Sequence, residues 1–218
     1  MAERKRAEIE VVMAEPKRAK KRKQSYSDLT IDDLEQVYGL SLTGADLFVE
    51  VASIPANEWL IESLNSGKPL AFTSEKARSE FIVAPVLLFV RDLLNESVTI
   101  YSGVRFDVDP DNGLKGVCDF IVGKAPALPI IQAPVLVMVE AKKNDIEDGL
   151  GQCAAEMVAA QIFNQRKGHE RTIYGCVTTG EKWLFLQLAG KSLVIDATRY
   201  DISNVEKIVG ILVHILSA

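Results

Sequence analysis

The segment "APVLVMVEAKKNDIEDGLGQ", from Ala133 to Gln152, determines how the rest of the chain is interpreted. Its first part is apolar at odd and even positions alike, which is typical of a strand covered on both faces. The apolar run ends in Glu140 and Lys142, two residues apart and therefore on the same face of the strand. Charge at the end of a buried strand needs a partner, because burying an unpaired charge is costly. The segment therefore predicts a functional site at this strand end.

The elements around this strand predict an α/β fold. Helices are expected first, at 30–39 with Thr30 as its cap, at 56–67 with Gly67 as its end, and at 73–95 with a break at Pro85. Alternating apolar residues and turn signals then predict strands around 97–109 and 114–123, before the strand at 135–143. A helix at 146–165, three strands at 172–180, 182–190 and 192–197, and a helix at 205–217 follow. Six strands with helices before, between and after them favour a mixed central β-sheet flanked by helices.

Composition favours one globular domain. The 218 residues are 48% hydrophobic and 25% charged, as in ordinary globular proteins. No apolar run reaches the roughly 18 to 20 residues of a membrane helix, and the charged N-terminus lacks a secretory signal, so no membrane partner is expected. The three cysteines are odd in number and widely spaced, which indicates free thiols in a reducing compartment. The expected location is the cytoplasm, or the nucleus in a eukaryotic host.

Charge divides the chain into a basic arm and an acidic body. Residues 1–24 carry nine Lys or Arg and four Glu, a net of +5, so a total of -5 leaves -10 for the rest. The predicted organisation is a mobile arm over 1–24 and a single α/β domain over 25–218. Within that domain, 25–72 is expected as a short helical extension and 73–190 as the core. The basic run at 16–23 has three interpretations: a solvated tail, a contact with a polyanion, or a nuclear-import signal.

Asp119 adds a second carboxylate to the predicted site. It lies among apolar residues in the strand before Glu140, and it faces Glu140 if the two strands are adjacent. Two facing carboxylates repel each other unless a positive charge lies between them, and Mg²⁺ or Mn²⁺ prefers such hard oxygen ligands. The ammonium group of Lys142 could stabilise charge that develops on a phosphate. These residue types at this spacing are suited to hydrolysis of a phosphodiester.

This pattern resembles the PD-(D/E)xK nuclease superfamily, which has the restriction-endonuclease-like fold. The resemblance rests on Asp119 and, about twenty residues later, Glu140-Ala141-Lys142, and it covers roughly residues 73 to 190. Glu80 in the helix before the first strand is similar to an acidic residue of many members. Gln152 is similar to a glutamine of the RecB-like and type I restriction nuclease branch.

The resemblance implies a role for each of these positions. Asp119 and Glu140 would be metal ligands with the backbone carbonyl of Ala141, and Lys142 would be the catalytic lysine. Glu80 would hold a metal-bound water or a second metal, and Gln152 would orient water or substrate.

The chain departs from the family pattern at two positions. Cys118 stands where the motif has proline. Glu156 stands where a tyrosine often follows the glutamine, and we expect it on the solvent face or as a packing polar residue. The second departure weakens the assignment to the RecB-like branch more than it affects the catalytic set.

Three functions remain open from the sequence. The leading hypothesis is a Mg²⁺- or Mn²⁺-dependent nuclease that hydrolyses DNA, which is favoured over RNA, by in-line attack of a metal-activated water. The alternative is a catalytically inactive nucleic-acid-binding or regulatory module on the same fold. The third is an interaction protein whose acidic surface meets a basic partner. The helix at 205–217 is apolar over a wide arc, so it packs on the sheet or forms the surface of a homodimer.

Overall fold

The computed structural model describes residues 24–71 and 73–217. The predicted basic arm therefore lies, except for its last residue, outside the described residues. The helices are α1 (Ile31–Tyr38), α2 (Glu58–Ala71), α3 (Glu75–Arg78), α4 (Ala84–Leu93), α5 (Glu147–Gln165) and α6 (Val205–Ser217), with a π-helical segment η2 (Ser79–Val83) joining α3 to α4. Short 3-10 turns are η1 (Tyr26–Asp28), η3 (Pro110–Asn112) and η4 (Ile202–Asn204). The strands are β1 (Ser41–Ala45), β2 (Thr99–Arg105), β3 (Val117–Gly123), β4 (Val135–Ala141), β5 (Ile173–Thr178), β6 (Lys182–Ala189) and β7 (Ser192–Asp201).

The seven strands form one mixed sheet in the order β1-β7-β6-β5-β4-β3-β2. The pairs β1–β7 and β4–β5 are parallel, and the other neighbours are antiparallel. This confirms the predicted α/β class with a mixed central sheet. The prediction of six strands was wrong because β1 was missed. All five residues of β1 are exposed, so its sequence "SLTGA" shows no apolar alternation that would signal a strand.

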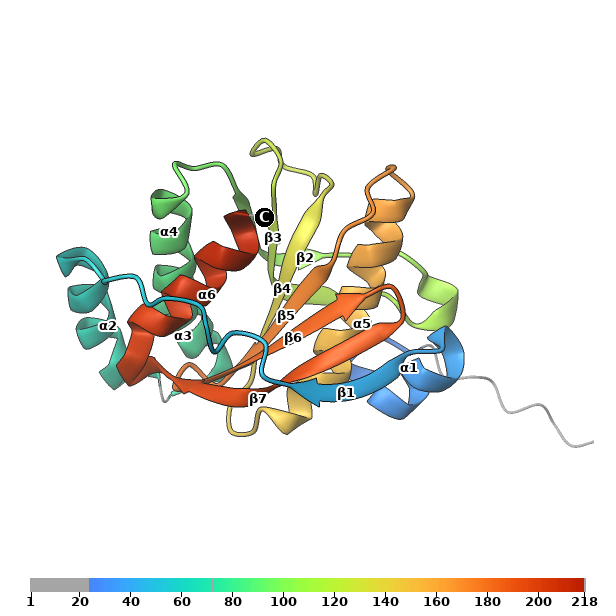
Figure 1. Ribbon diagram of the computed structural model, residues 1–218, viewed down its shortest axis with the longest axis horizontal. Helices are drawn as coiled ribbons and strands as arrows, with labels where there is room; N and C mark the ends of the chain where they lie inside the picture. Colours follow the sequence, from blue (N-terminus) through green and yellow to red (C-terminus); the bar gives the residue numbers. More distant parts are fainter. Residues whose placement is uncertain (1–23, 72, 218) are drawn as a thin grey trace, which may run out of the picture.

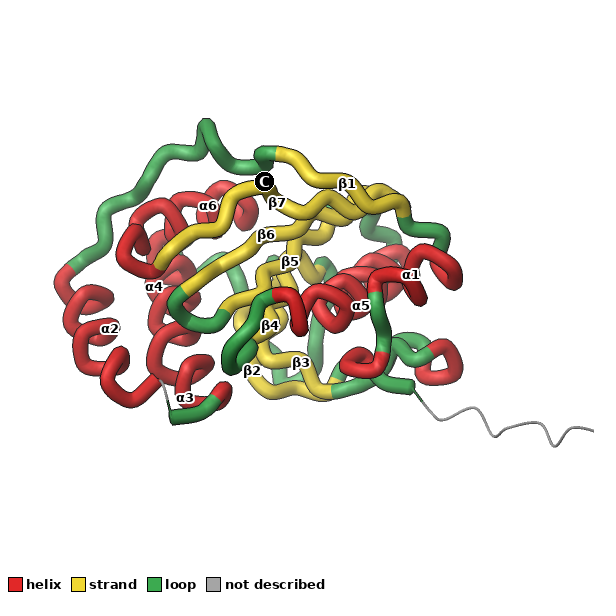
Figure 2. Tube along the Cα trace, turned by 90° about the horizontal axis from the view of Figure 1, so that it is seen from below, coloured by secondary structure: helices red, strands yellow, loops and turns green. Residues whose placement is uncertain are grey.

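Helices cover both faces of the sheet. Figures 1 and 2 show α2, α3, α4 and α6 on one face and α1 and α5 on the other. Each face has its own core, one around Trp183 and Phe185 and the other around Met138 and Met157. Strand β4 lies between the two cores and is buried along its whole length, as its apolar pattern predicts. The residues at the end of β4 are therefore held by a strand in which every residue is buried.

Helix α6 packs on the sheet. Its apolar residues are buried in the first core, among them Ile208, Ile211 and Ile215. Of the two alternatives for this helix, packing on the sheet is confirmed, and a homodimer stays a prediction. None of the helices in the described part of the chain is long and apolar enough to cross a membrane.

The first helices differ from prediction in instructive ways. Thr30 caps α1 by accepting a hydrogen bond from the Asp33 N–H (3.2 Å), and Gly39 ends that helix with a φ of 67°, both as expected. Helix α2, however, does not end at Gly67 but continues to Ala71. A Cβ at Gly67 would overlap the carbonyl group of Phe81, so this glycine lets α2 approach the next helix instead of ending its own.

The break expected at Pro85 is confirmed. The segment from Glu75 to Leu93 is divided by η2, in which the Ala84 N–H donates to the carbonyl of Ser79, five residues back. Pro85 lies in the first turn of α4, where its missing N–H is tolerated. The wide π turn also changes which residues of this segment face the sheet.

One end of the sheet collects the residues predicted to be functional. Strands β4 and β5 are parallel, so their C-terminal ends lie together, and the Lys142 N–H donates to the Thr178 carbonyl across this end (2.7 Å). Strand β3 runs antiparallel to β4, so its start brings Asp119 to the same end. The N-termini of α3 and α5 also lie at this end, the lower one in Figure 1.

Candidate active site

Glu140 and Lys142 form an ion pair at the end of β4. The Lys142 Nζ lies 2.8 Å from Glu140 Oε1, which confirms that the two side chains share a face. Glu140 is only 2% exposed, and the side chain of Lys142 is 17% exposed. Lys143, the next residue, is exposed to solvent. The buried strand thus presents one carboxylate and one ammonium group, with only the ammonium group near the surface.

Asp119 lies beside this pair. Phe120 is paired with Val139, and continuing that antiparallel register by one residue brings Asp119 opposite Glu140. Its Oδ2 accepts a hydrogen bond from the backbone N–H of Ala141 (2.8 Å). Burial raises the pKa of Asp119, although the Ala141 N–H and the charge of Lys142 oppose the rise. Asp119, Glu140, Ala141 and Lys142 are therefore brought together as the sequence predicts.

The surroundings raise the pKa of both side chains, which favours the charged form of Lys142 and the neutral form of Glu140. Burial, and next the charge of Asp119, raise the pKa of Glu140 to about 8, and Lys142 only partly offsets this. Burial acts to lower the pKa of Lys142, but attraction to Glu140 and their hydrogen bond outweigh it, so that pKa is raised. Lys142 therefore stays positively charged at neutral pH, whereas Glu140 resists ionisation until more positive charge is supplied.

Gln152 and Glu156 of α5 extend the pair into a hydrogen-bonded chain. Lys142 Nζ donates to Gln152 Oε1 (3.0 Å), and Gln152 Nε2 donates to Glu156 Oε1 (3.1 Å). Because the amide group of Gln152 donates to Glu156, its oxygen must face Lys142. Gln152 thus lies where the sequence predicts and orients the lysine.

Glu156 is buried, so of the two placements expected for it, on the solvent face or as a packing polar residue, the first is wrong. It is 0% exposed, and burial followed by the charge of Glu140 raises its pKa well above the ordinary value. Cys118, at the proline position of the motif, also contributes a hydrogen bond to it. The sequence could have signalled this burial, because Glu156 lies in the run "CAAEMVAA" of small and apolar residues.

Acidic residues of α3 and η2 line a hollow of about 240 Å³ over Asp119. Glu80, the predicted residue, lines this hollow, but its carboxylate pairs with Lys76 (3.0 Å) and is largely exposed. Glu75, which the sequence analysis missed, lines the same hollow and is half-buried. Its charge contributes to raising the pKa of Asp119 and of Glu140. Helical spacing alone could not identify Glu75, because η2 changes the phase of the helix between the two glutamates.

The oxygen atoms of Asp119, Glu140 and the Ala141 carbonyl group are suited as ligands of a hard divalent cation. Across the described residues, Glu140 Oε2 and Glu156 Oε2 are the buried side-chain oxygens or nitrogens with no hydrogen-bond partner. An unpaired buried oxygen beside a second carboxylate is unfavourable unless a proton or a cation compensates it. Residues 24–71 and 73–217 contain no group of three or more Asp, Glu, His or Cys side chains that could hold a metal ion. A cation here would therefore need Asp119, Glu140 and a backbone carbonyl, for which Ala141 is placed at the strand end.

Comparison with known proteins gives one similarity and no family. No protein-family model matches the chain. The chain is similar to Crinkler effector protein 1 of Rhizophagus irregularis, with 24% identity over 180 residues. The matched region covers 75% of this chain and 37% of that protein, so the chain spans little more than a third of the relative's length.

Proposed function

We propose that this chain is a divalent-cation-dependent nuclease of the PD-(D/E)xK type that hydrolyses phosphodiester bonds in DNA. The observation that carries the proposal is the pair at the end of β4: Glu140 with a buried, unpartnered oxygen, and Lys142 at 2.8 Å from its other oxygen. Asp119 opposite Glu140 supplies the second carboxylate. A buried acidic pair beside a fixed ammonium group is suited to chemistry in which a cation and a phosphate meet.

Asp119, Glu140 and the carbonyl group of Ala141 would hold Mg²⁺ or Mn²⁺. Such a cation polarises phosphate oxygens and lowers the pKa of water. The raised pKa of Glu140, caused first by burial and then by Asp119, supports this assignment, because a cation would relieve the repulsion between the two carboxylates. Glu75, on the wall of the same hollow, adds negative charge that would attract a cation to this end of the sheet.

Lys142 acts as a fixed positive charge in this proposal. Its pKa is raised by Glu140, so it keeps its proton at neutral pH and is not a general base. The ammonium group of Lys142 is held on one side by Gln152 and on the other side by Glu140. Because the ammonium group of Lys142 is positioned before the reaction, it would stabilise the charge that develops on a phosphate without any reorganisation of the site.

A second candidate is an inactive module on the same fold. Internal hydrogen bonds hold the chain from Glu140 through Lys142 and Gln152 to Glu156, and protons on the two glutamates would remove the charge that a cation would otherwise compensate. Such a site needs no cation and performs no hydrolysis. The relative from Rhizophagus irregularis is named an effector, and a role as an effector is compatible with either candidate for this chain.

Cleavage of DNA under controlled metal conditions separates the two candidates. Labelled single- and double-stranded DNA is incubated with wild type, Asp119→Asn and Glu140→Gln in Mg²⁺, Mn²⁺ or EDTA. The matched control is Glu62→Gln, which changes an exposed glutamate of α2. The proposal predicts cleavage that requires the cation and is lost only in the two site variants. DNA that stays intact with wild type under every condition would support the inactive module.

A further inference from the structure

A cavity of about 310 Å³ is lined by Arg78, whose guanidinium group donates a hydrogen bond to the backbone carbonyl of Lys142. It opens between α2, α3 and the turn that joins β5 to β6. Its charged lining residues are Lys68, Arg78, Glu181 and Asp201, and its apolar ones are Ala71, Ile82 and Ile202. Its volume is at the lower end of the range for small-molecule sites, which is about 300 to 1,000 Å³. The cavity therefore has room for a ligand of modest size beside the candidate active site.

Arg78 is the main polar group of this cavity. Its guanidinium is half-buried and donates one long hydrogen bond (3.5 Å) to the backbone carbonyl of Lys142. In the part of the chain that the structure describes, no carboxylate lies within ion-pairing distance of Arg78. A guanidinium group has five N–H donors in a planar fork that matches a phosphate, so most of its donors remain available. This group is therefore an anion site linked directly to the backbone of the predicted catalytic lysine.

The walls around Arg78 are fixed. Gly180 has a φ of +82° and packs against the aliphatic part of Arg78, where an added Cβ would lie 3.5 Å from its Cβ. The Gly180 N–H donates to Thr178 Oγ1 (2.9 Å), and the Gly180 carbonyl accepts from Trp183 Nε1 (3.2 Å). Since Trp183 is buried in the core, the turn cannot shift easily. The aliphatic part of Arg78 therefore packs against a fixed wall, which restricts its conformations and lowers the entropic cost of binding.

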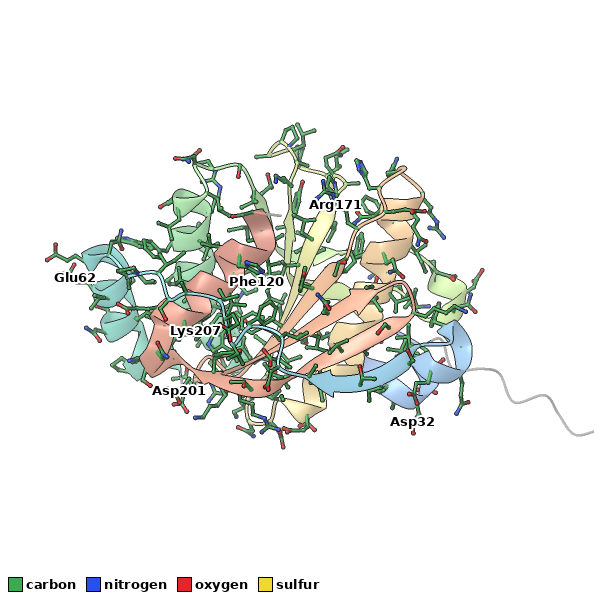
Figure 3. The ribbon with its side chains drawn as sticks, viewed as in Figure 1. Asp32, Glu62, Phe120, Arg171, Asp201 and Lys207 are labelled. Atoms are coloured by element: carbon green, nitrogen blue, oxygen red, sulfur yellow. The ribbon has the colours of Figure 1, made fainter. Side chains whose placement is uncertain are left out.

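The remaining lining gives the cavity an apolar floor and a rim of mixed charge. Ala71, Ile82 and Ile202 supply the floor, and each is less than a tenth exposed. Lys68 adds a second cation at the rim, and the exposed side chain of Glu181 adds a carboxylate there. Asp201, which also lines the cavity and is labelled in Figure 3, is neutralised by Lys182 at 2.7 Å. An anionic group at Arg78 and a flat apolar group on the floor would both be accommodated.

We propose that this cavity binds the nucleotide of DNA that adjoins the scissile phosphate, with its own phosphate on Arg78 and its base or sugar on the apolar floor. This inference rests on the proposed function, because it places the nucleotide beside Lys142. It deepens that function by assigning a substrate subsite outside the carboxylate centre. Arg78 is a binding residue in this account, and it does not touch the reacting atoms.

Binding of DNA without metal tests the subsite separately from cleavage. The probe is a fluorescein-labelled single-stranded DNA of twelve nucleotides, and its affinity for the full chain is measured by anisotropy in EDTA over a range of salt concentrations. Arg78→Ala is compared with Arg78→Lys and with the control Arg91→Ala. Arg91 is an arginine of α4 that pairs with Glu96 and does not line the cavity. Thermal unfolding of each variant shows that it is folded at the assay temperature.

We expect Arg78→Ala to bind the probe roughly 10- to 100-fold more weakly, because a charge-assisted contact with phosphate is lost. The slope of log affinity against log salt should fall by about 0.7, the value for one phosphate contact on a single strand. Arg78→Lys should keep the slope and recover part of the affinity, and Arg91→Ala should match wild type.

Equal affinity and equal salt slope for wild type and Arg78→Ala would overturn the subsite, and so would failure of wild type to bind the probe. Cleavage by wild type is measured in the same preparations. Cleavage with no effect of Arg78 on binding would reject the subsite and keep the nuclease. An effect of Arg78 on binding without cleavage would reject the nuclease and keep a nucleotide-binding cavity.

Discussion

Replacing Glu156 by glutamine should stabilise the protein at alkaline pH. Glu156 is completely buried, its Oε2 has no hydrogen-bond partner among the described residues, and its pKa is raised by burial and by Glu140. The folded chain therefore keeps a proton on Glu156 that the unfolded chain releases above the ordinary pKa of 4.5. The stability that this carboxyl group contributes is complete below pH 4.5 and is lost as the pH rises toward its folded-state pKa.

The size of the effect follows from proton linkage. One group that is protonated when folded and ionised when unfolded lowers the free energy of unfolding by about 1.4 kcal/mol for each pH unit. Glutamine has the shape of the protonated acid, can still accept from Gln152, and does not titrate. Over each pH unit in which Glu156 keeps its proton in the folded chain, Glu156→Gln should therefore gain about 1.4 kcal/mol relative to wild type. For a chain of 218 residues this corresponds to a relative gain in Tm of roughly 3 to 6 °C per pH unit.

The assay is thermal unfolding in EDTA at pH 6, 7 and 8, followed by circular dichroism. The control variant is Glu62→Gln, because Glu62 points away from the protein at the outer side of α2 (Figure 3). Its Tm should track wild type at all three pH values. A Tm difference between Glu156→Gln and wild type that does not grow with pH would refute a protonated, buried Glu156. So would a variant that is less stable than wild type at pH 8.

Three further predictions concern other parts of the fold. Gly67→Ala should lower the free energy of unfolding by about 1 to 3 kcal/mol, measured by thermal unfolding, because the new methyl group would overlap the Phe81 carbonyl. Lys207→Met should speed amide hydrogen exchange in the segment 48–51, because Lys207 Nζ donates to the carbonyl groups of Phe48 (2.7 Å), Val49 (3.1 Å) and Val51. Addition of Mg²⁺ at pH 8 should raise the Tm of wild type, and Asp119→Asn should abolish that rise, since a cation held by the folded chain stabilises it by mass action.

Each of these predictions has a matched control or a contrary outcome. Gly44→Ala should be neutral, because an added Cβ there would meet only a backbone oxygen at 3.9 Å. The Lys207 prediction fails if exchange in the 48–51 segment is unchanged; Figure 3 shows this lysine of α6 beside that segment. For the Mg²⁺ prediction, an equal rise in Tm for wild type and Asp119→Asn would show that the cation binds elsewhere.

The strand that carries Glu140 could be predicted because residues adjacent in the sequence determine both its burial and the face on which its charged side chains lie. An unbroken apolar run needs cover on both faces, and β4 is covered by two cores. The spacing of Glu140 and Lys142 by two residues fixes a shared face in any strand, and the ion pair at 2.8 Å follows from it. Asp119 was predicted from its place among apolar residues in the strand before Glu140, whereas Gln152 was implied by the resemblance to the nuclease superfamily.

The features that were missed depend on contacts between distant segments. Strand β1 exists because it pairs with β7, about 150 residues later, and its own five exposed residues give no signal. Gly67 was interpreted as a helix end because its partner at Phe81 lies on another helix. Glu80 was chosen from the resemblance to the nuclease superfamily, and Glu75 gave no signal because the π turn at Ser79–Val83 cannot be seen in helical periodicity. In each case the local pattern was compatible with two structures, and packing decided between them.

The most direct test of the central claim compares Lys142→Ala with Lys143→Ala in DNA cleavage. The two lysines are adjacent in sequence, but only Lys142 pairs with Glu140 and donates to the amide oxygen of Gln152, whereas Lys143 is exposed. Cleavage in Mg²⁺ should fall roughly 100- to 10,000-fold in Lys142→Ala and stay within a few-fold of wild type in Lys143→Ala. Cleavage that is equal in the two variants would contradict a nuclease site at the end of β4.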